Sequence, residues 1–466
     1  MKILQVSNGF PPIAIAGVEQ YTYQLSRALS ARHDVRIFCR ESNPRLADYE
    51  IIDDVYENLP VRRVVNDFQH VLHIRDFYIN QRIEDIFYHT LAEWRPDVIH
   101  FQHCIGLSAS LLEVAAEAQI PYLLTLHDYW FICSRVQLFH RHGYICPGPI
   151  ADVDCYDCMF SPRGLLGPIR RTPFYRFLRA RLDDSTKRRV LRILSRLIPR
   201  LPPPDPEQAL SPFESRNEYM LSLLSAIPIM LAPSNFVRNT YTAHGVPADR
   251  VVVLPLGLDL SPWRGHRFYD PTSTDHLHLG YLGTLLYHKG VHILIKAFHR
   301  LKNPKATLSI YGFPIPDDPY IDELQKLAAQ DSRVHLMGRY QRQDIPTILS
   351  GIDVVVIPSL WHETFSIVAR EALLSSTPVI ASRVGALPAI IRDGENGCLV
   401  PCGDVDALHA ALFSLSMDRD RLLHLRKGAR RSINHIKNIE DHACEIELIY
   451  EELSETAPRK LASVGV

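Results

Sequence analysis

Residues 362–371 read HETFSIVARE and lie between two apolar runs, DVVVIPS at 353–359 and PVIAS at 378–382. Short apolar runs bounded by turn residues are typical of buried strands. The pattern therefore predicts a strand, a loop, one helix that begins near Ser366, and a second strand. In open α/β sheets, ligands bind outside the carboxyl ends of the strands. We therefore expect a binding site at this loop.

Two glutamates, Glu363 in the loop and Glu371 in the helix, stand eight positions apart. Eight helical residues span about 12 Å, whereas the two carboxylates of a glycosidase lie roughly 5–9.5 Å apart. The pair is therefore better suited to holding two parts of one long polar ligand than to hydrolysis. The backbone N–H groups of Thr364, Phe365 and Ser366, at the helix start, favour an anion. Taken alone, two acids at this spacing also fit an ordinary surface turn.

The run from Glu363 to Ala372 resembles the E-x7-E signature of the retaining glycosyltransferases of family 4. These are nucleotide-sugar enzymes of the GT-B fold, α/β proteins with two facing doubly wound (Rossmann-like) domains. The resemblance implies an N-terminal acceptor-side domain at 1–262, with a Cys-rich loop at 130–160 and a basic insertion at 161–205. It further implies a nucleotide-sugar-binding domain at 263–434 and a C-terminal helix at 435–466 that crosses back to the first domain.

The resemblance also implies roles for individual residues. His127, in the string TLHD, matches the active-site histidine of the family, and Lys289 matches its phosphate-binding lysine. A lysine at a strand–loop–helix turn also suits a diphosphate on physical grounds, because the ammonium group and the helix N–H groups attract anions. Glu363 would hold donor-sugar hydroxyls and Glu371 the ribose. The other donor-binding residues implied are Gly17, Gly283, Thr284, Gly312, Arg339, Thr364, Phe365 and Ser366.

The sequence departs from the family pattern at three positions. Ala16 replaces the first of two glycines, Thr284 stands where an arginine is usual, and Ala389 stands where a glutamate is usual. Arg339 is a candidate replacement for the missing cation. These losses favour an alternative, a non-catalytic sugar-nucleotide-binding or scaffold protein. A GT-B epimerase or phosphorylase is a second alternative, which E-x7-E together with His127 disfavours.

Composition sets broad limits on the class of protein. The 466 residues are 46% hydrophobic and 22% charged with a net charge of −1, which is ordinary for a globular protein without an overall bias toward nucleic acid. Apolar runs stay below the roughly 18 residues that a membrane helix needs. Nine cysteines in a chain without a secretory pattern at its start indicate a reducing compartment. We therefore expect a cytoplasmic location.

Four cysteines cluster in the Cys-rich loop: Cys133, Cys146, Cys155 and Cys158. Cys155 and Cys158 have the C-x2-C spacing of a zinc site, and four thiolates suffice for tetrahedral Zn²⁺. The first two are more widely spaced, so scattered thiols or a redox pair remain alternatives. Any zinc here would be structural, because a four-thiolate site has no open position.

A basic segment spans residues 163–200, where twelve Arg or Lys residues stand against two aspartates. Apolar residues at near-helical spacing interrupt them, which predicts a basic amphipathic helix that contacts an anionic membrane surface. A solvated helix face on a long insertion is the alternative. Aromatic residues occur only near the start of the segment, so nucleic acid is disfavoured.

The resemblance as a whole implies transfer of a hexose from a nucleoside-diphosphate sugar to a hydroxyl, with retention of configuration. The acceptor would be a glycan or a lipid-linked molecule in polysaccharide or glycolipid assembly. The reaction would need no cofactor and no metal, since the departing phosphate takes the acceptor proton. The enzyme would be cytoplasmic, with peripheral attachment at the inner face of the membrane.

Overall fold

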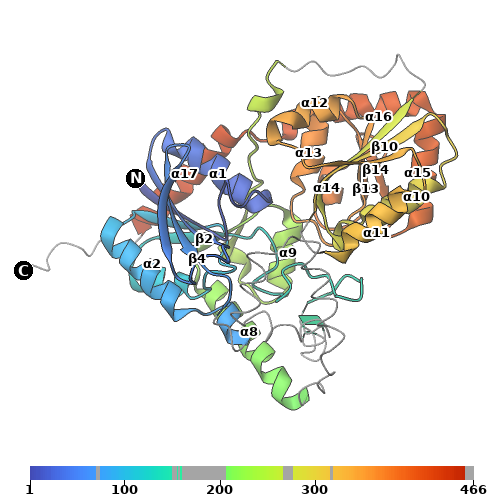
Figure 1. The fold of residues 1–466 in the computed structure, drawn as a ribbon. Helices are drawn as coiled ribbons and strands as arrows, with labels where there is room; N and C mark the ends of the chain where they lie inside the picture. Colours follow the sequence, from blue (N-terminus) through green and yellow to red (C-terminus); the bar gives the residue numbers. More distant parts are fainter. Residues whose placement is uncertain are drawn as a thin grey trace, which may run out of the picture. The chain divides into compact units, whose positions relative to one another are not determined.

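Two units make up the computed structural model, which describes residues 1–69, 74–148, 155, 158–159, 206–265, 276–314 and 318–456 (Figure 1). The first unit comprises Met1–Val136, Gly148–Gly257 and Asn438–Val466, and the second comprises Gln137–Pro147 and Leu258–Lys437. Each is built on a largely parallel sheet, so the predicted α/β class is confirmed. The basic segment 163–200 lies outside the described residues.

The sheet of the first unit has the strand order β3-β4-β2-β1-β5-β6-β7-β8. All pairs are parallel except β3–β4, which form an antiparallel hairpin at one edge. The central strands are buried along their whole length because helices cover both faces. The strands are β1 (Lys2–Ser7), β2 (Asp34–Glu41), β3 (Ile51–Tyr56), β4 (Leu59–Val65), β5 (Val98–Phe101), β6 (Tyr122–Thr125), β7 (Ile229–Ala232) and β8 (Val251–Val253).

The helices of the first unit include one from the far end of the chain. They are α1 (Gly17–Ser30), α2 (Gln81–Trp94), α3 (Leu111–Glu117), α8 (Pro206–Ala226), α9 (Asn235–Ala243) and α17 (Ile439–Thr456). Helix α17 packs against α1 and reaches β5, and Figure 1 shows its red ribbon beside blue α1. Tyr450 of α17 is fully buried, and its hydroxyl accepts a hydrogen bond from Gln5 of β1 at 3.1 Å. The last helix is thus part of the core of this unit.

The sheet of the second unit is parallel throughout, in the order β11-β10-β9-β12-β13-β14. The chain extends the sheet from β9 outward to β11 and then continues on the other side of β9, so the order reverses between β9 and β12. Ligands bind at such reversals in doubly wound sheets. The strands are β9 (Leu277–Leu285), β10 (Ala306–Pro314), β11 (Val334–Gly338), β12 (Val354–Ile357), β13 (Val379–Ser382) and β14 (Gly397–Val400).

Two hydrophobic cores lie on the two faces of this second sheet. Alternate residues of β12 point to opposite cores: Val354 and Val356 to one, Val355 and Ile357 to the other. The first core is shared with α10 (Val291–His299), α11 (Pro319–Ala328) and α15 (Val405–Met417). The second is shared with α12 (Ile345–Ser350), α13 (Ile367–Leu374) and α14 (Leu387–Ile390), and α16 (Arg419–Ser432) reaches both.

A short hairpin at 137–147 belongs to the second unit, although the sequence reading included it in the first domain. Phe139 and Ile145 pair as an antiparallel bridge. The ring of Phe139 contacts Tyr287 and His288, with centroids 6.5 and 6.4 Å apart. These contacts fasten the hairpin to the turn η6 (Tyr287–Lys289) of the second unit.

Within the described residues, no helix combines the length and the apolar character needed to cross a membrane.

Candidate active site

The carboxyl ends of β9 and β12 carry the predicted donor residues of the second unit. After β9 the chain forms η6, which ends at Lys289, and then enters α10. After β12 it forms the loop with Glu363 and then enters α13, as the apolar pattern predicts. Helices α10 and α13 cover opposite faces of the sheet. Both segments therefore lie at the reversal of strand order.

Lys289 and Glu363 form an ion pair, with 2.7 Å between Nζ and Oε1. The same Oε1 accepts hydrogen bonds from Ser359 Oγ at 2.6 Å and from Trp361 Nε1 at 2.9 Å. Burial disfavours the charge of Glu363, but the charge of Lys289 and these hydrogen bonds outweigh it, so the pKa of Glu363 lies below its ordinary value. Glu363 is therefore held as an anion.

Two glycines allow the backbone around this pair to pack closely. Gly290 has φ +72°, and a Cβ there would lie 1.9 Å from the carbonyl oxygen of Pro358. Gly385 has φ +56°, and a Cβ there would lie 2.3 Å from the carbonyl oxygen of Glu363. No side chain fits at such distances, and the left-handed backbone itself favours glycine. The positions of Lys289 and Glu363 thus depend on two glycines.

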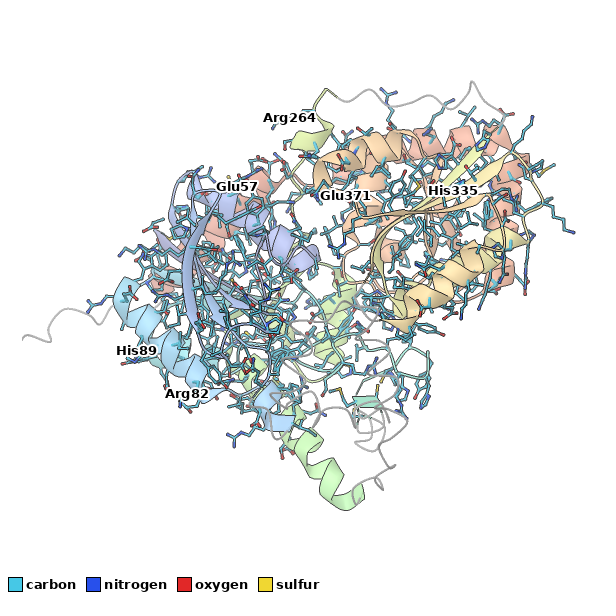
Figure 2. All side chains as sticks on the ribbon, in the orientation of Figure 1. Glu57, Arg82, His89, Arg264, His335 and Glu371 are labelled. Atoms are coloured by element: carbon cyan, nitrogen blue, oxygen red, sulfur yellow. The ribbon has the colours of Figure 1, made fainter. Side chains whose placement is uncertain are left out.

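Glu371 is buried on α13 with an arginine as its partner (Figure 2). Arg342, in the turn η7 (Arg342–Asp344) after β11, donates from Nη1 to Glu371 Oε1 at 2.8 Å. Burial raises the pKa of Glu371, and the charge and hydrogen bond of Arg342 only partly offset this effect. Burial raises the pKa of the Tyr340 phenol, and the charge of Glu371 raises it further. Glu371 thus belongs to a second polar group.

The loop between the two glutamates is fixed by an arginine that the sequence reading did not single out. Arg370 donates from Nη1 to the carbonyl oxygens of Phe365 and Ser366, and its guanidinium lies 3.4 Å from the centre of the Phe365 ring. Ser366, the N-cap of α13, has φ +58°. Thr364 is half-buried beside it. The cation therefore holds a backbone turn that few side chains adopt.

The remaining predicted donor residues lie at the rim of the same sheet. Gly283, near the carboxyl end of β9, has φ +146°. The Tyr281 hydroxyl donates to the carbonyl oxygen of Thr284 at 2.7 Å, which fixes this end of the strand. Gly312 pairs with Gly283 across β10 and β9. Arg339 is exposed after β11, whereas Arg342 contacts an acid of the site.

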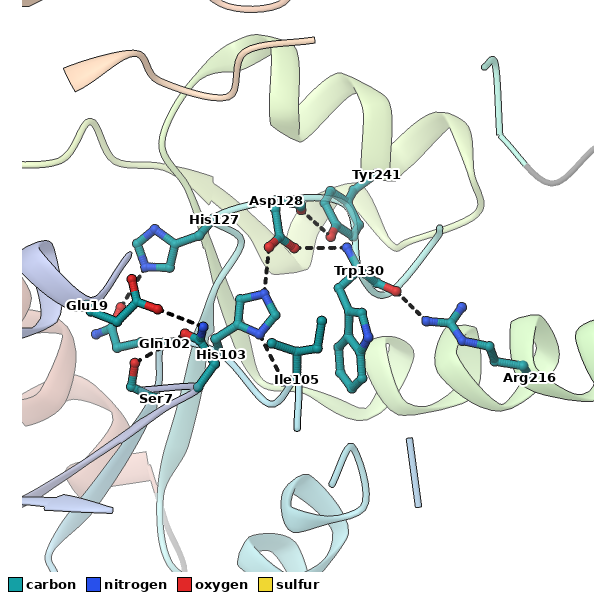
Figure 3. Close-up of polar contacts among 11 residues, drawn as sticks. Ser7, Glu19, Gln102, His103, Ile105, His127, Asp128, Trp130, Arg216 and Tyr241 are labelled. Carbon is teal, nitrogen blue, oxygen red and sulfur yellow. Dashed lines mark hydrogen bonds and ion pairs between the residues drawn. The ribbon is translucent and has the colours of Figure 1, made fainter. Parts of the chain in front are cut away.

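His127 of the first unit lies in a chain of buried hydrogen bonds (Figure 3). Its Nε2 contacts Gln102 Oε1 at 2.8 Å, and Gln102 in turn donates to Gln5 at 2.9 Å. Because the amide oxygen accepts, His127 carries its proton on Nε2. Burial, helped by the charges of nearby histidines, lowers the pKa of His127 to about 3. The histidine is therefore neutral at physiological pH.

The loop after His127 is anchored by its aspartate. Asp128 accepts from His103 Nε2 at 2.6 Å and from the backbone N–H of Trp130 at 2.9 Å. Tyr241 donates to its carbonyl oxygen at 2.7 Å (Figure 3). The turn that carries His127 is thus held at three points. The predicted donor-binding glycine of the first unit, Gly17, is exposed at the first position of α1.

Zinc binding by the four cysteines of the Cys-rich loop stays a prediction. All four are described, yet within the described residues no group of three or more His, Cys, Asp or Glu side chains could hold a metal ion. The backbone carbonyl of Cys158 accepts a hydrogen bond from Arg135 Nη1 at 2.9 Å, a contact that does not involve the thiol.

Sequence reasoning did not single out several residues that contact the predicted site residues. Ser359 and Trp361 lie within four positions of Glu363, so their contact follows from the loop once its course is known. Arg342 comes from a different strand end, 29 positions from Glu371. Gln102 directly follows β5, where a polar residue at a strand end is a general indicator of a site.

Comparison with known proteins agrees with this geometry. Two family models match: "Glycosyl transferases group 1" over residues 276–418 and "Glycosyltransferase Family 4" over residues 15–181. A glycogen synthase of Mycobacterium tuberculosis is 25% identical over 449 residues, which is 93% of this chain and 90% of the relative.

Solved structures share the fold at lower identity. Sucrose-phosphate synthase from Thermosynechococcus elongatus superposes with a TM-score of 0.65 at 19% identity, covering 97% of this chain and 98% of the other. Anabaena HepE in complex with UDP-glucose gives 0.62 at 16% identity, covering 97% and 100%. With the family matches, these likenesses lead to one assignment. The chain belongs to glycosyltransferase family 4 and has the two-domain GT-B fold.

Proposed function

We propose that the protein is a retaining glycosyltransferase that moves a hexose from a nucleoside-diphosphate sugar to a hydroxyl of a glycan or lipid-linked acceptor. The observation that carries the proposal is the ion pair between Lys289 and Glu363, at the reversal of strand order in the second unit. The members of the family use nucleotide-sugar substrates. The complex of HepE with UDP-glucose makes a UDP-sugar the first donor to test.

In the proposed reaction the diphosphate leaves while the acceptor attacks from the same face of the sugar. Lys289 and the backbone N–H groups at the start of α13 would stabilise the departing diphosphate, since preorganised donors act most strongly where charge develops. Glu363 would accept from donor-sugar hydroxyls and Glu371 from the ribose. His127, neutral with its Nδ1 as an acceptor, would contact the sugar. The departing phosphate would take the acceptor proton.

Binding and turnover test this proposal in two steps. Titration calorimetry with UDP, GDP, ADP and dTDP, each with and without its sugar, would identify the donor class. Proton NMR of the sugar released from that donor would show the α-anomer first if an α-linked donor reacts with retention. Appearance of the β-anomer first would exclude a retaining mechanism, and no binding of any nucleotide would reject the donor site.

The role of Lys289 has its own test. Lys289→Ala should lower turnover at least about a hundredfold, because a charge that stabilises the leaving group is lost. The control is Lys302→Ala, which removes an exposed lysine of the same unit. Since Lys289→Ala also leaves Glu363 buried without its cation, the melting temperature should be measured alongside. A loss of activity that merely follows the loss of folded protein would contradict a catalytic role.

A non-catalytic sugar-nucleotide-binding protein is the second candidate, and one observation favours it. Thr284 stands where family members carry an arginine, and its side chain brings no charge to the carboxyl end of β9. This candidate predicts nucleotide binding by the wild-type protein without release of sugar.

The location that we propose is cytoplasmic. Attachment to the membrane rests on the basic segment 163–200 and is tested by sedimentation with anionic vesicles.

A further inference from the structure

Trp361 contacts both members of the ion pair in the second unit. Its indole Nε1 donates to Glu363 Oε1 at 2.9 Å, and Lys289 Nζ lies 4.7 Å from the centre of its ring. The His288 ring packs on the indole edge-to-face, with centroids 5.3 Å apart. Trp361 is only 9% exposed. One side chain thus binds an acid through its N–H and a base through its face.

The hydrogen bonds at Glu363 are distributed unevenly between its two oxygens. Lys289, Ser359 and Trp361 all donate to Oε1. Among the described residues, none donates to Oε2, although the side chain is nearly buried. Three donors on one oxygen fix the orientation of the carboxylate plane, and they leave the second oxygen for a ligand.

The face of the indole acts on Lys289 in a different way. A lysine ammonium is attracted to the negative face of an aromatic ring, most strongly to tryptophan. Lysine side chains are otherwise flexible, with four rotatable bonds. The ring and Glu363 together therefore restrict Nζ to one position at the end of η6.

From these contacts we infer that Trp361 is a positioning residue of the donor site, which works through two separate groups. Its N–H orients Glu363 toward the hydroxyls of the donor sugar. Its ring places Lys289 for the diphosphate. The inference rests on the proposed function, because it assumes that Glu363 and Lys289 contact those parts of the donor.

The two halves of the inference can be separated by substitution. Trp361→Phe removes the N–H but keeps an aromatic face under Lys289. Trp361→Leu removes both, and Trp361→Met does the same with a longer side chain if the leucine variant does not fold. Trp263→Phe is the matched control, because Trp263 is 8% exposed in the same unit and donates from Nε1 to Ser375 Oγ at 2.8 Å. The control loses the same group from a buried site away from the ion pair.

Two measurements report on the two halves. The first is the rate at which the protein releases nucleoside diphosphate from its sugar donor without acceptor. The second is the calorimetric Kd of whichever of UDP, GDP, ADP and dTDP the wild-type protein binds most tightly. Trp361→Phe should lower kcat about tenfold, as expected for a lost hydrogen bond to a charged group, with a Kd within about twofold of wild type. Trp361→Leu should also weaken the Kd about fivefold, as expected for a lost cation–π contact.

Trp263→Phe should lower the melting temperature by about as much as Trp361→Phe does. It should leave both kcat and Kd within about twofold of wild type. The inference is overturned if Trp361→Phe and Trp263→Phe have the same kcat, or if Trp361→Leu or its methionine substitute leaves the Kd unchanged. Failure of the proposed function looks different, since the wild-type protein would then release no nucleotide from any donor. An active wild type with equal tryptophan variants would reject the role of Trp361 alone.

Discussion

Two buried glutamates of the second unit have opposite shifts in pKa, and the difference comes from their partners. The pKa of Glu363 is lowered because the charge of Lys289 and three hydrogen bonds outweigh burial, whereas that of Glu371 is raised because burial exceeds the effect of Arg342. Glu363 therefore contributes stability above its unfolded pKa that is lost as the pH falls. Glu371 acts in the opposite direction, since its proton uptake favours the folded state at low pH. The two acids of one motif thus respond oppositely to acid.

Glu371→Ala tests the proposed contact with ribose. We expect the nucleotide Kd to rise at least fivefold, about 1 kcal/mol, because hydroxyl groups of the ligand lose an acceptor. Glu395→Ala serves as the control, since Glu395 is an exposed acid of the same unit that forms an ion pair with Arg392 at 3.7 Å. Titration calorimetry on both variants measures the effect. A Kd equal to that of wild type in Glu371→Ala would exclude the contact.

His100 of the first unit should make stability depend on pH. Burial, with a further contribution from the charge of His442, lowers the pKa of His100 to about 3, whereas an unfolded histidine titrates near 6.5. The unfolded state therefore binds the extra proton between these values, and stability falls as the pH drops below about 6.5. His100→Gln should reduce that slope by about 1.4 kcal/mol per pH unit.

Urea unfolding at pH 4 to 7 measures the slope for His100→Gln. The exposed His89→Gln, on α2 of the same unit (Figure 2), provides the comparison and should leave the slope unchanged. The hydrogen bonds of His100 to Tyr450 and Thr125 also disappear in the variant. The free energy of unfolding will therefore fall at every pH, but that loss does not alter the slope. Equal slopes in the two variants would contradict a buried neutral His100.

The turn from β9 into α10 depends on one glycine. Gly290→Ala should destabilise the second unit by about 2 kcal/mol or more, because a Cβ would overlap the carbonyl oxygen of Pro358 as well as strain the backbone. Gly394→Ala isolates the strain, since Gly394 has φ +79° and a Cβ there would meet nothing within 4 Å. Thermal unfolding distinguishes them. Equal losses would mean that the overlap with the carbonyl oxygen of Pro358 contributes nothing.

Elements were predictable where apolar periodicity is strong. The strands expected at 353–359 and 378–382 and the helix expected to begin near Ser366 agree with β12, β13 and α13. Contacts between distant segments were not predictable, because periodicity describes one element at a time. Arg339 was a candidate replacement cation whose place the sequence could not give, and the arginine that contacts Glu371 is Arg342. The position of the hairpin at 137–147 could likewise not be predicted from the sequence. Its Phe139 contacts Tyr287, which lies more than a hundred residues away in the chain.

For the whole molecule, two separate sheets predict two unfolding transitions. Most of the residues proposed to bind the nucleotide lie in the second unit, so a bound nucleotide should raise only one melting temperature. Removal of residues 438–466 should lower the other, because Tyr450 and Ile446 are buried in the first unit. Differential scanning calorimetry of the full and shortened chains, with and without nucleotide, tests both effects. A single transition that shifts in both experiments would contradict independent units.

The return of α17 to the first unit also sets an order of events on the ribosome. Gln5 is translated before Tyr450, its hydrogen-bond partner, which lies 445 residues later in the chain. Residues 258–437, by contrast, emerge as one continuous segment that supplies every strand of the second sheet. Domains fold as units once their residues have left the ribosome. When residue 437 has left the ribosome and α17 has not, the nascent chain would therefore carry a folded second unit and a first-unit sheet that still lacks α17.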